Sequence, residues 1–285
     1  MPALAIAALF AAAVTPSNAM QPMGQWILQG EENMCALLHV YEGRGQTITL
    51  GVRPWPLGGG ADILIFRTVP RIDMDEGTAH LTIDAQPTAD APYEIYYPNP
   101  NTDTRLISFT IGESSLASMS GAKSLSVTLG KGRPIEVALP EMSRAFGALR
   151  KCKDILLTQL KIDAHALDQT ATPPLPREDV NRWLSPADFP GDRYFDPAGT
   201  TKLLLTIDAS GTVTDCHPFG SAGNTTIDAA ACSIFLKRGR FNPGLDAQHQ
   251  PIAAYSYQRV HWRRMKNGLI APESDPPAPP RSQSR

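Results

Sequence analysis

Short apolar runs separated by turn residues dominate the first half of the chain. Across residues 20–160, segments rich in Val, Ile, Leu, Thr, Phe and Tyr alternate with Gly, Pro, Asn and Asp. This pattern is typical of strands joined by turns, so an antiparallel β-sandwich or barrel is expected. The predicted strands are 46–52, 62–69, 80–85, 93–97, 106–111, 124–129 and 135–139.

The period of the pattern changes at the end of this region. Apolar residues then recur every three or four positions, as on one stripe of a helix: Met142, Phe146, Leu149, Cys152, Leu156 and Leu160. We therefore expect a helix that closes the β-rich region and carries Cys152 on its buried side.

The last third of the chain has a different order of patterns. Leu203, Leu205 and Ile207 alternate with Lys202, Thr206 and Asp208, and the turn residues 208–211 lead into a second run at 212–217. These features predict a β-hairpin. Thr225 is expected to cap a helix that ends near Gly239, and residues 253–262 predict a further strand. The expected order is β-β-α-β.

This order, with five short sequence elements, resembles the TonB C-terminal domain family. The matching elements are Asp188-Phe189-Pro190, residues 205–213, Gly220-Ser221-Ala222-Gly223, Ile227-Asp228-Ala229-Ala230 and Arg240-Phe241-Asn242-Pro243. They fall within 178–264, less than a third of the chain. The fold class expected for the whole chain is α+β: an antiparallel β-rich domain closed by a helix, then a small TonB-like domain.

The resemblance implies a protein-binding function. Domains of this family bind an extended segment of an outer-membrane transporter during TonB-linked transmembrane transport, and an exposed strand edge would explain such binding. An ordinary self-paired strand is the alternative for the same residues. The candidate partner-binding edge comprises Ala253, Ala254, Tyr255, Ser256, Tyr257, Gln258, Arg259, Val260, His261 and Trp262.

The remaining segments define the expected organisation. Residues 1–19 contain a short apolar run followed by Ser17 and Ala19, which predicts a cleaved signal peptide and export to the periplasm. The β-rich domain spans 20–168, a Pro-rich linker 169–177, the TonB-like domain 178–264 and a disordered tail 265–285. With the apolar segment removed and a linker this short, energy transduction is disfavoured. A structural or dimerising envelope protein is the alternative function, and an enzyme with its site in the β-rich domain is a third.

The four cysteines support export. An oxidising compartment favours complete pairing of an even number of cysteines, and one of three connectivities keeps each bridge within one domain. That connectivity is Cys35 with Cys152 and Cys216 with Cys232; four buried free thiols are the alternative.

Composition and motifs give no indication of catalysis. The net charge of −2 and the scattered Lys and Arg residues disfavour nucleic-acid binding. The six histidines are isolated and lack metal-ligand spacing, and Gly58-Gly59-Gly60 lacks the Lys and Ser/Thr of a phosphate loop. We therefore expect no enzyme, no cofactor and no metal, and a protein partner in the cell envelope or a second copy of the chain.

Overall fold

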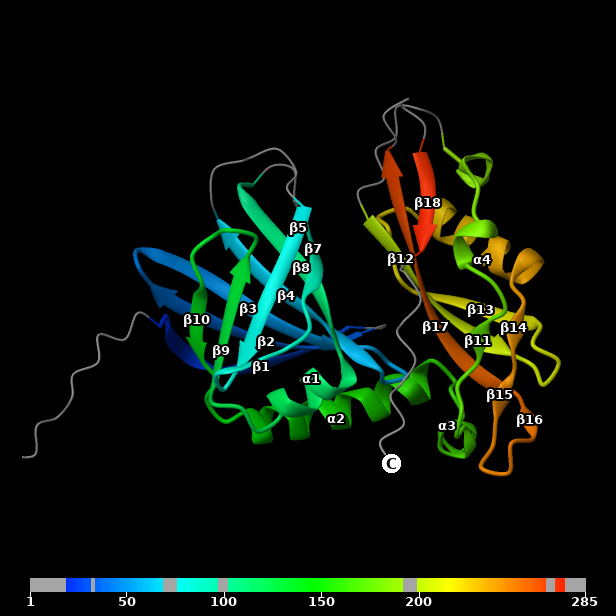
Figure 1. Ribbon diagram of the computed structural model, residues 1–285, viewed down its shortest axis with the longest axis horizontal. Helices are drawn as coiled ribbons and strands as arrows, with labels where there is room; N and C mark the ends of the chain where they lie inside the picture. The colour runs from blue at the N-terminus through cyan, green and yellow to red at the C-terminus, as the bar shows by residue number, and fades with distance from the viewer. Residues whose placement is uncertain are drawn as a thin grey trace, which may run out of the picture.

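The chain folds around two antiparallel sheets, seen on the left and right of Figure 1. The computed structural model describes residues 19–31, 34–68, 76–96, 102–191, 199–264 and 270–274. The mixed α+β class is therefore confirmed. The predicted signal peptide lies outside the described residues except for Ala19.

The large sheet contains the first ten strands. Its order is β1-β2-β3-β4-β8-β7-β5-β9-β10, with β6 beside β5, and neighbouring strands are antiparallel throughout. The strands are β1 (Gln21–Glu31), β2 (Met34–Gly43), β3 (Gln46–Pro54), β4 (Gly60–Thr68), β5 (Glu76–Ile83), β6 (Gln86–Pro87), β7 (Ala91–Tyr96), β8 (Thr104–Gly112), β9 (Ser124–Leu129) and β10 (Ile135–Ala138).

This sheet curls until it nearly closes into a barrel-like form. Met20, just before β1, bridges to Val137 in β10, and its backbone N–H donates to the carbonyl of Glu136 at 2.7 Å. Alternate residues of each strand point into the curl because side chains alternate between the faces of a strand. Ile63 and Ile65 of β4 and Ile107 of β8 are such residues, and all three are buried in the core.

Two helices cover the large sheet. They are α1 (Glu113–Met119) and α2 (Met142–Gln159), which runs beneath the sheet in Figure 1. The sequence predicts α2 correctly, and its buried residues Met142, Phe146, Leu149 and Leu156 lie on the predicted stripe. A disulfide between Cys35 in β2 and Cys152 in α2 joins the helix to the sheet, with the two Cα atoms 6.0 Å apart.

The segment after α2 folds onto the C-terminal part of the chain. It contains α3 (Ala164–Gln169), β11 (Leu175–Pro176) and two short 3₁₀ helices, η1 (Val180–Arg182) and η2 (Pro186–Asp188). β11 pairs with β14 (Phe241–Asn242), and Thr172 bridges to Leu245. Residues 169–177 are therefore hydrogen-bonded to the C-terminal part, not a free linker.

The small sheet has the order β13-β12-β17-β18. Its strands are β12 (Gly199–Ile207), β13 (Val213–Gly220), β17 (Ala254–Arg264) and β18 (Ile270–Ser274), and the short pair β15 (Gly244–Leu245) and β16 (Pro251–Ile252) lies beside it. The helix α4 (Thr225–Arg238) covers one face, where Leu203, Leu205 and Phe235 are fully buried. The expected order β-β-α-β is thus found in β12, β13, α4 and β17.

Two local predictions in this region are corrected. Asn224, not Thr225, caps α4, because its side chain accepts the N–H groups of Thr226 and Ile227. Residues 270–274, expected within a disordered tail, form β18 and pair with Val260–Arg264. Alternate residues of β18, including Ile270, are buried. The apolar side chains of this strand therefore belong to the core of the small sheet, although the sequence pattern placed them in the tail.

Candidate functional site

The predicted partner-binding strand is β17, and the structure places it inside the small sheet. β17 pairs with β12 along Ala254–Trp262 and with β18 from Val260 to Arg264. Val260, His261 and Trp262 therefore have strands on both sides, and an incoming segment cannot pair with them. The edge assignment is wrong for these three residues, because β18 was assigned to the tail.

Side chains of β17 also contact the large-sheet half of the molecule. The rings of Tyr257 and Trp55 stack with centroids 5.1 Å apart. The Tyr255 hydroxyl accepts the backbone N–H of Asp163, in the connection between α2 and α3, at 3.0 Å. Leu204 of β12 and Leu157 of α2 belong to one buried cluster at this junction. The face of β17 that points away from α4 is thus used within the chain.

A buried carboxylate lies at the centre of this junction. Asp62 of β4 is 1% exposed and accepts hydrogen bonds from the cations of both halves. Its Oδ2 atom is 2.7 Å from an Arg53 guanidinium nitrogen and 2.6 Å from Lys202 Nζ, while Oδ1 is 3.1 Å from Arg259 and from Trp55 Nε1. We call Asp62, Arg53, Lys202 and Arg259 the Asp62 cluster.

The charges of this cluster determine its protonation. Burial alone would raise the pKa of Asp62, but Lys202, Arg53 and Arg259 outweigh that effect and hold the pKa well below its usual value. Burial lowers the pKa of Lys202 to about 8, and the two arginines add to this while Asp62 opposes it. At neutral pH Asp62 and Lys202 are both charged, so the ion pairs of the cluster hold the two sheets together.

The low pKa of Asp62 predicts a specific loss of stability in acid. Its contribution is complete above the unfolded pKa of 3.8 and declines as the pH falls below it, because only the unfolded chain then takes up the proton. Between pH 4.5 and pH 3.0 the wild type should lose about 1 kcal/mol more unfolding free energy than Asp62→Asn does. Urea unfolding at both pH values measures this; equal losses in the two proteins would contradict it.

The second predicted disulfide lies away from this junction. Cys216 in β13 and Cys232 in α4 are bonded, with Cα atoms 5.5 Å apart. Both pairs are those that the sequence predicts. In the small sheet the bridge fixes β13 to the helix that covers it, and β13 forms one edge of the sheet.

An exposed strand edge lies in the other sheet, on β1. On one side β1 pairs with β2 at Gln21–Met23 and Ile27–Glu31, and residues 24–26 form a bulge between these stretches. From Pro22 to Leu28 no other described strand pairs with β1, and the only neighbouring bridge is at Met20. Met23, Ile27 and Leu28 of this segment expose 46%, 59% and 39% of their surface. Unpaired backbone groups beside exposed apolar side chains are the features of a strand that accepts another strand.

The helix α2 gives the surface beside β1 a positive charge. Trp26 Nε1 of β1 donates to the carbonyl of Pro140, just before α2, at 2.7 Å, and Gly30 of β1 lies against the sulfur of Cys152 in α2. The outer face of α2 has a shallow hollow of about 700 Å³ over Gly147 and Ala148. Basic residues at this hollow are Arg144, Arg150, Lys151 and Lys153, beside one acid, Asp154.

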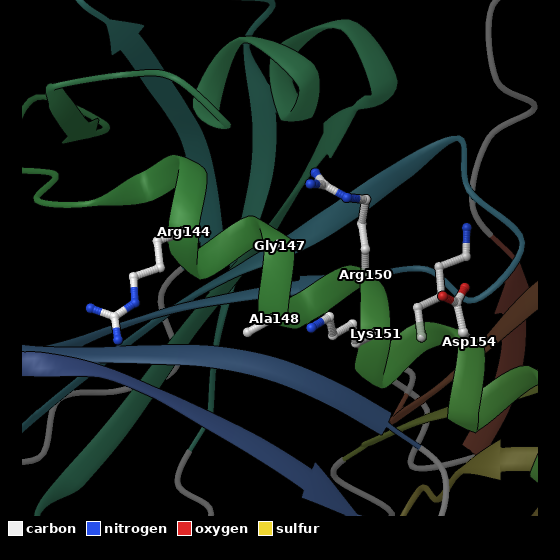
Figure 2. Close-up of a pocket in the computed structure, with 7 residues that line it drawn as sticks. Arg144, Gly147, Ala148, Arg150, Lys151 and Asp154 are labelled. Carbon is white, nitrogen blue, oxygen red and sulfur yellow. The ribbon is translucent and has the colours of Figure 1, made fainter.

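Figure 2 shows that the side chains of Arg144, Arg150 and Lys151 point in different directions from α2. They charge the outer face broadly and do not converge on one point, as catalytic or metal-binding groups must. Within the described ranges, no three His, Cys, Asp or Glu side chains are grouped as metal ligands. Among the same residues, no helix is both long and apolar enough to cross a membrane.

The sequence contained only a weak signal for the β1 edge. Residues 21–31 include Trp26, Ile27 and Leu28 but also three glutamines and two glycines, so the alternation of a half-buried strand is not visible. The exposure of the apolar residues follows from the position of β1 at the end of the sheet order, which pairing alone reveals. The positive face of α2 could have been read from its helical period, because the basic residues fall between the apolar positions.

Comparison of the chain with protein-family models, with curated proteins and with solved structures gave no match.

Proposed function

We propose that this chain is an exported protein-binding module of the cell envelope, without catalytic activity, that takes an extended segment of a partner protein as an added strand. The observation that carries the proposal is the β1 edge, with Met23, Ile27 and Leu28 exposed along it. Two disulfides support an oxidising compartment such as the periplasm. The β-β-α-β order of the small sheet supports the resemblance to the TonB C-terminal domain.

The chemistry of the partner follows from the surface around β1. Strand addition supplies main-chain hydrogen bonds, and apolar side chains of the segment would pack on Ile27 and Met23. The basic outer face of α2 favours acidic side chains in the same segment and speeds its association. An outer-membrane transporter with an extended periplasmic segment is the partner that the TonB resemblance favours.

The charge of α2 also argues against the alternative of a dimer through β1. Antiparallel pairing of two β1 edges would bring two copies of the basic helix face toward each other, and like charges across an interface are unfavourable. A dimer through another surface, such as the β13 edge, would leave the β1 edge available. The alternative therefore predicts self-association that β1 variants do not change.

The test is the exchange of β1 amides upon binding. We expect envelope extract to yield a partner whose addition slows hydrogen exchange in β1 and leaves exchange in β13 unchanged. Ile27→Lys, which places a charge on the edge, should reduce capture at least tenfold. Leu236→Lys is the matched control, because Leu236 is an exposed apolar residue of α4.

Three results would contradict the proposal. Full capture by a folded Ile27→Lys variant would show that β1 is not the binding edge. If the partner slowed hydrogen exchange only in the small sheet, the binding site would lie in the TonB-like part and not on β1. Self-association as the sole interaction, seen by light scattering of the purified chain, would favour the structural alternative.

A further inference from the structure

Two arginines lie side by side inside the large sheet. Arg67 of β4 pairs directly with Arg105 of β8, and residues opposite each other in antiparallel strands have neighbouring side chains. Arg67 follows the inward-pointing Ile63 and Ile65 with period two, and Arg105 precedes the inward-pointing Ile107 in the same way. Both guanidinium groups therefore belong to the inner face of the curl, near the end of the sheet where β4 stops and β8 starts (Figure 1).

Neither arginine has a counter-ion among the residues that the structure describes. Arg105 is 6% exposed, and the Nε atoms of both side chains are buried without a hydrogen-bond partner there. Burial, together with the charge of Arg105, lowers the pKa of Arg67. Like charges directly opposite each other destabilise a sheet, and a buried charge without a partner is costlier still.

The same level of the sheet carries a further donor without a partner. The register runs from Tyr41 to Ile48, from Ile48 to Arg67 and from Arg67 to Arg105, which places these residues in one row across four strands. The Tyr41 hydroxyl is fully buried and has no hydrogen-bond partner within the described ranges. Burial raises the pKa of Tyr41 far above neutrality, so the hydroxyl keeps its proton.

His39 extends this polar lining by one step along β2. Its ring lies 4.8 Å from that of Tyr41, and its Nε2 atom is buried without a described partner. Nδ1 is 2.8 Å from the carbonyl of Val40, an arrangement in which Nδ1 carries the proton. Buried polar groups in folded proteins are nearly always paired, so four such residues in one interior need an explanation.

We propose that this end of the large sheet is an anion-binding site that takes the carboxylate or phosphate group of a small molecule between Arg67 and Arg105. Two guanidinium groups side by side can each donate hydrogen bonds to the oxygens of such a group. The negative charge of the anion would offset the repulsion between the two arginines. The Tyr41 hydroxyl lies in the same row, two strands from Arg67, and has no described hydrogen-bond partner. This site is independent of the β1 edge and adds a small-molecule ligand to the protein-binding function.

The experiment measures binding of inorganic phosphate and of succinate to the full chain by calorimetry and by the melting temperature. Sodium chloride at matched ionic strength is the reference for general salt effects. We expect at least one of the two anions to bind and to raise the melting temperature, and the stronger of the two identifies the ligand class. Arg67→Gln and Arg105→Gln should each weaken binding at least tenfold, while Arg133→Gln, at an exposed position between β9 and β10, should not.

A second readout separates this role from a structural one. Without an anion, Arg105→Gln should melt at the same temperature as the wild type or higher, because it removes a buried like-charge contact. A fall in melting temperature without anion, combined with unchanged anion affinity, would show that Arg105 serves the fold alone and would overturn the proposal. Absence of binding by both anions, or equal binding by wild type and both arginine variants, would also overturn it.

Discussion

Replacing Asp62 by asparagine is expected to lower the free energy of unfolding by about 3–5 kcal/mol, because it leaves Lys202 and two arginines buried without their shared carboxylate. The side chains are nearly the same size, so packing changes little. Urea unfolding followed by far-UV circular dichroism measures the loss. Tryptophan fluorescence should report separation of Trp55 from Tyr257 at a lower urea concentration than in the wild type.

Two matched variants test the physical reason for this effect. Asp90→Asn alters an exposed hydrogen bond to His80 and should cost less than about 1 kcal/mol. Lys202→Met removes one of three cations and leaves Asp62 paired with both arginines, so it should cost much less than Asp62→Asn. If Asp62→Asn and Lys202→Met were equally harmful, pairing of the carboxylate would not be what stabilises the junction.

Removal of the Cys35–Cys152 disulfide is expected to cost more than removal of Cys216–Cys232. The two bridges span 117 and 16 residues, and the entropy of the closed loop in the unfolded chain predicts about 4.7 and about 3 kcal/mol. Cys→Ser double variants of each pair, unfolded in urea under the same conditions, measure both losses. Serine keeps the size of the side chain close to that of cysteine.

A control is available in the fully reduced wild type. It should unfold with the summed loss of the two double variants, because the bridges lie in separate cores and share no partner. A larger loss for the Cys216–Cys232 variant would show that native-state strain or packing, not loop entropy, dominates at one of the bridges.

Local patterns predicted much of the fold. The apolar stripe of α2 and the alternation of β12 are set by residues close in sequence, so the presence of both elements and their buried faces could be read directly. The cysteine pairs were predicted from the expected oxidising compartment and from the rule that each bridge stays within one domain. α3 and β18 were missed because neither is long enough to show a period, and β18 forms only by pairing with β17.

The functional surfaces depended on long-range pairing and could not be read from the sequence. The edge or interior position of a strand depends on which neighbours pair with it, so β17 was assigned an edge that Val260, His261 and Trp262 do not have. Asp62 is 140 residues from Lys202 and 197 from Arg259 along the chain. Arg67 and Arg105 each look like an ordinary charged residue near a strand end until the register places them together.

The disulfide between Cys35 and Cys152 also determines how the chain carries mechanical tension. A pull applied to both ends passes from β1 through Cys35, crosses the bridge and continues down the last turns of α2. The residues enclosed by the bridge lie off this path. While the disulfide is intact, these residues carry no tension, and roughly 400 Å of chain cannot be extended by the pull. Of the large sheet, only the short stretch before Cys35 bears the pull. β1 would therefore separate from the sheet first, while the row that contains Arg67 and Arg105 carries no tension.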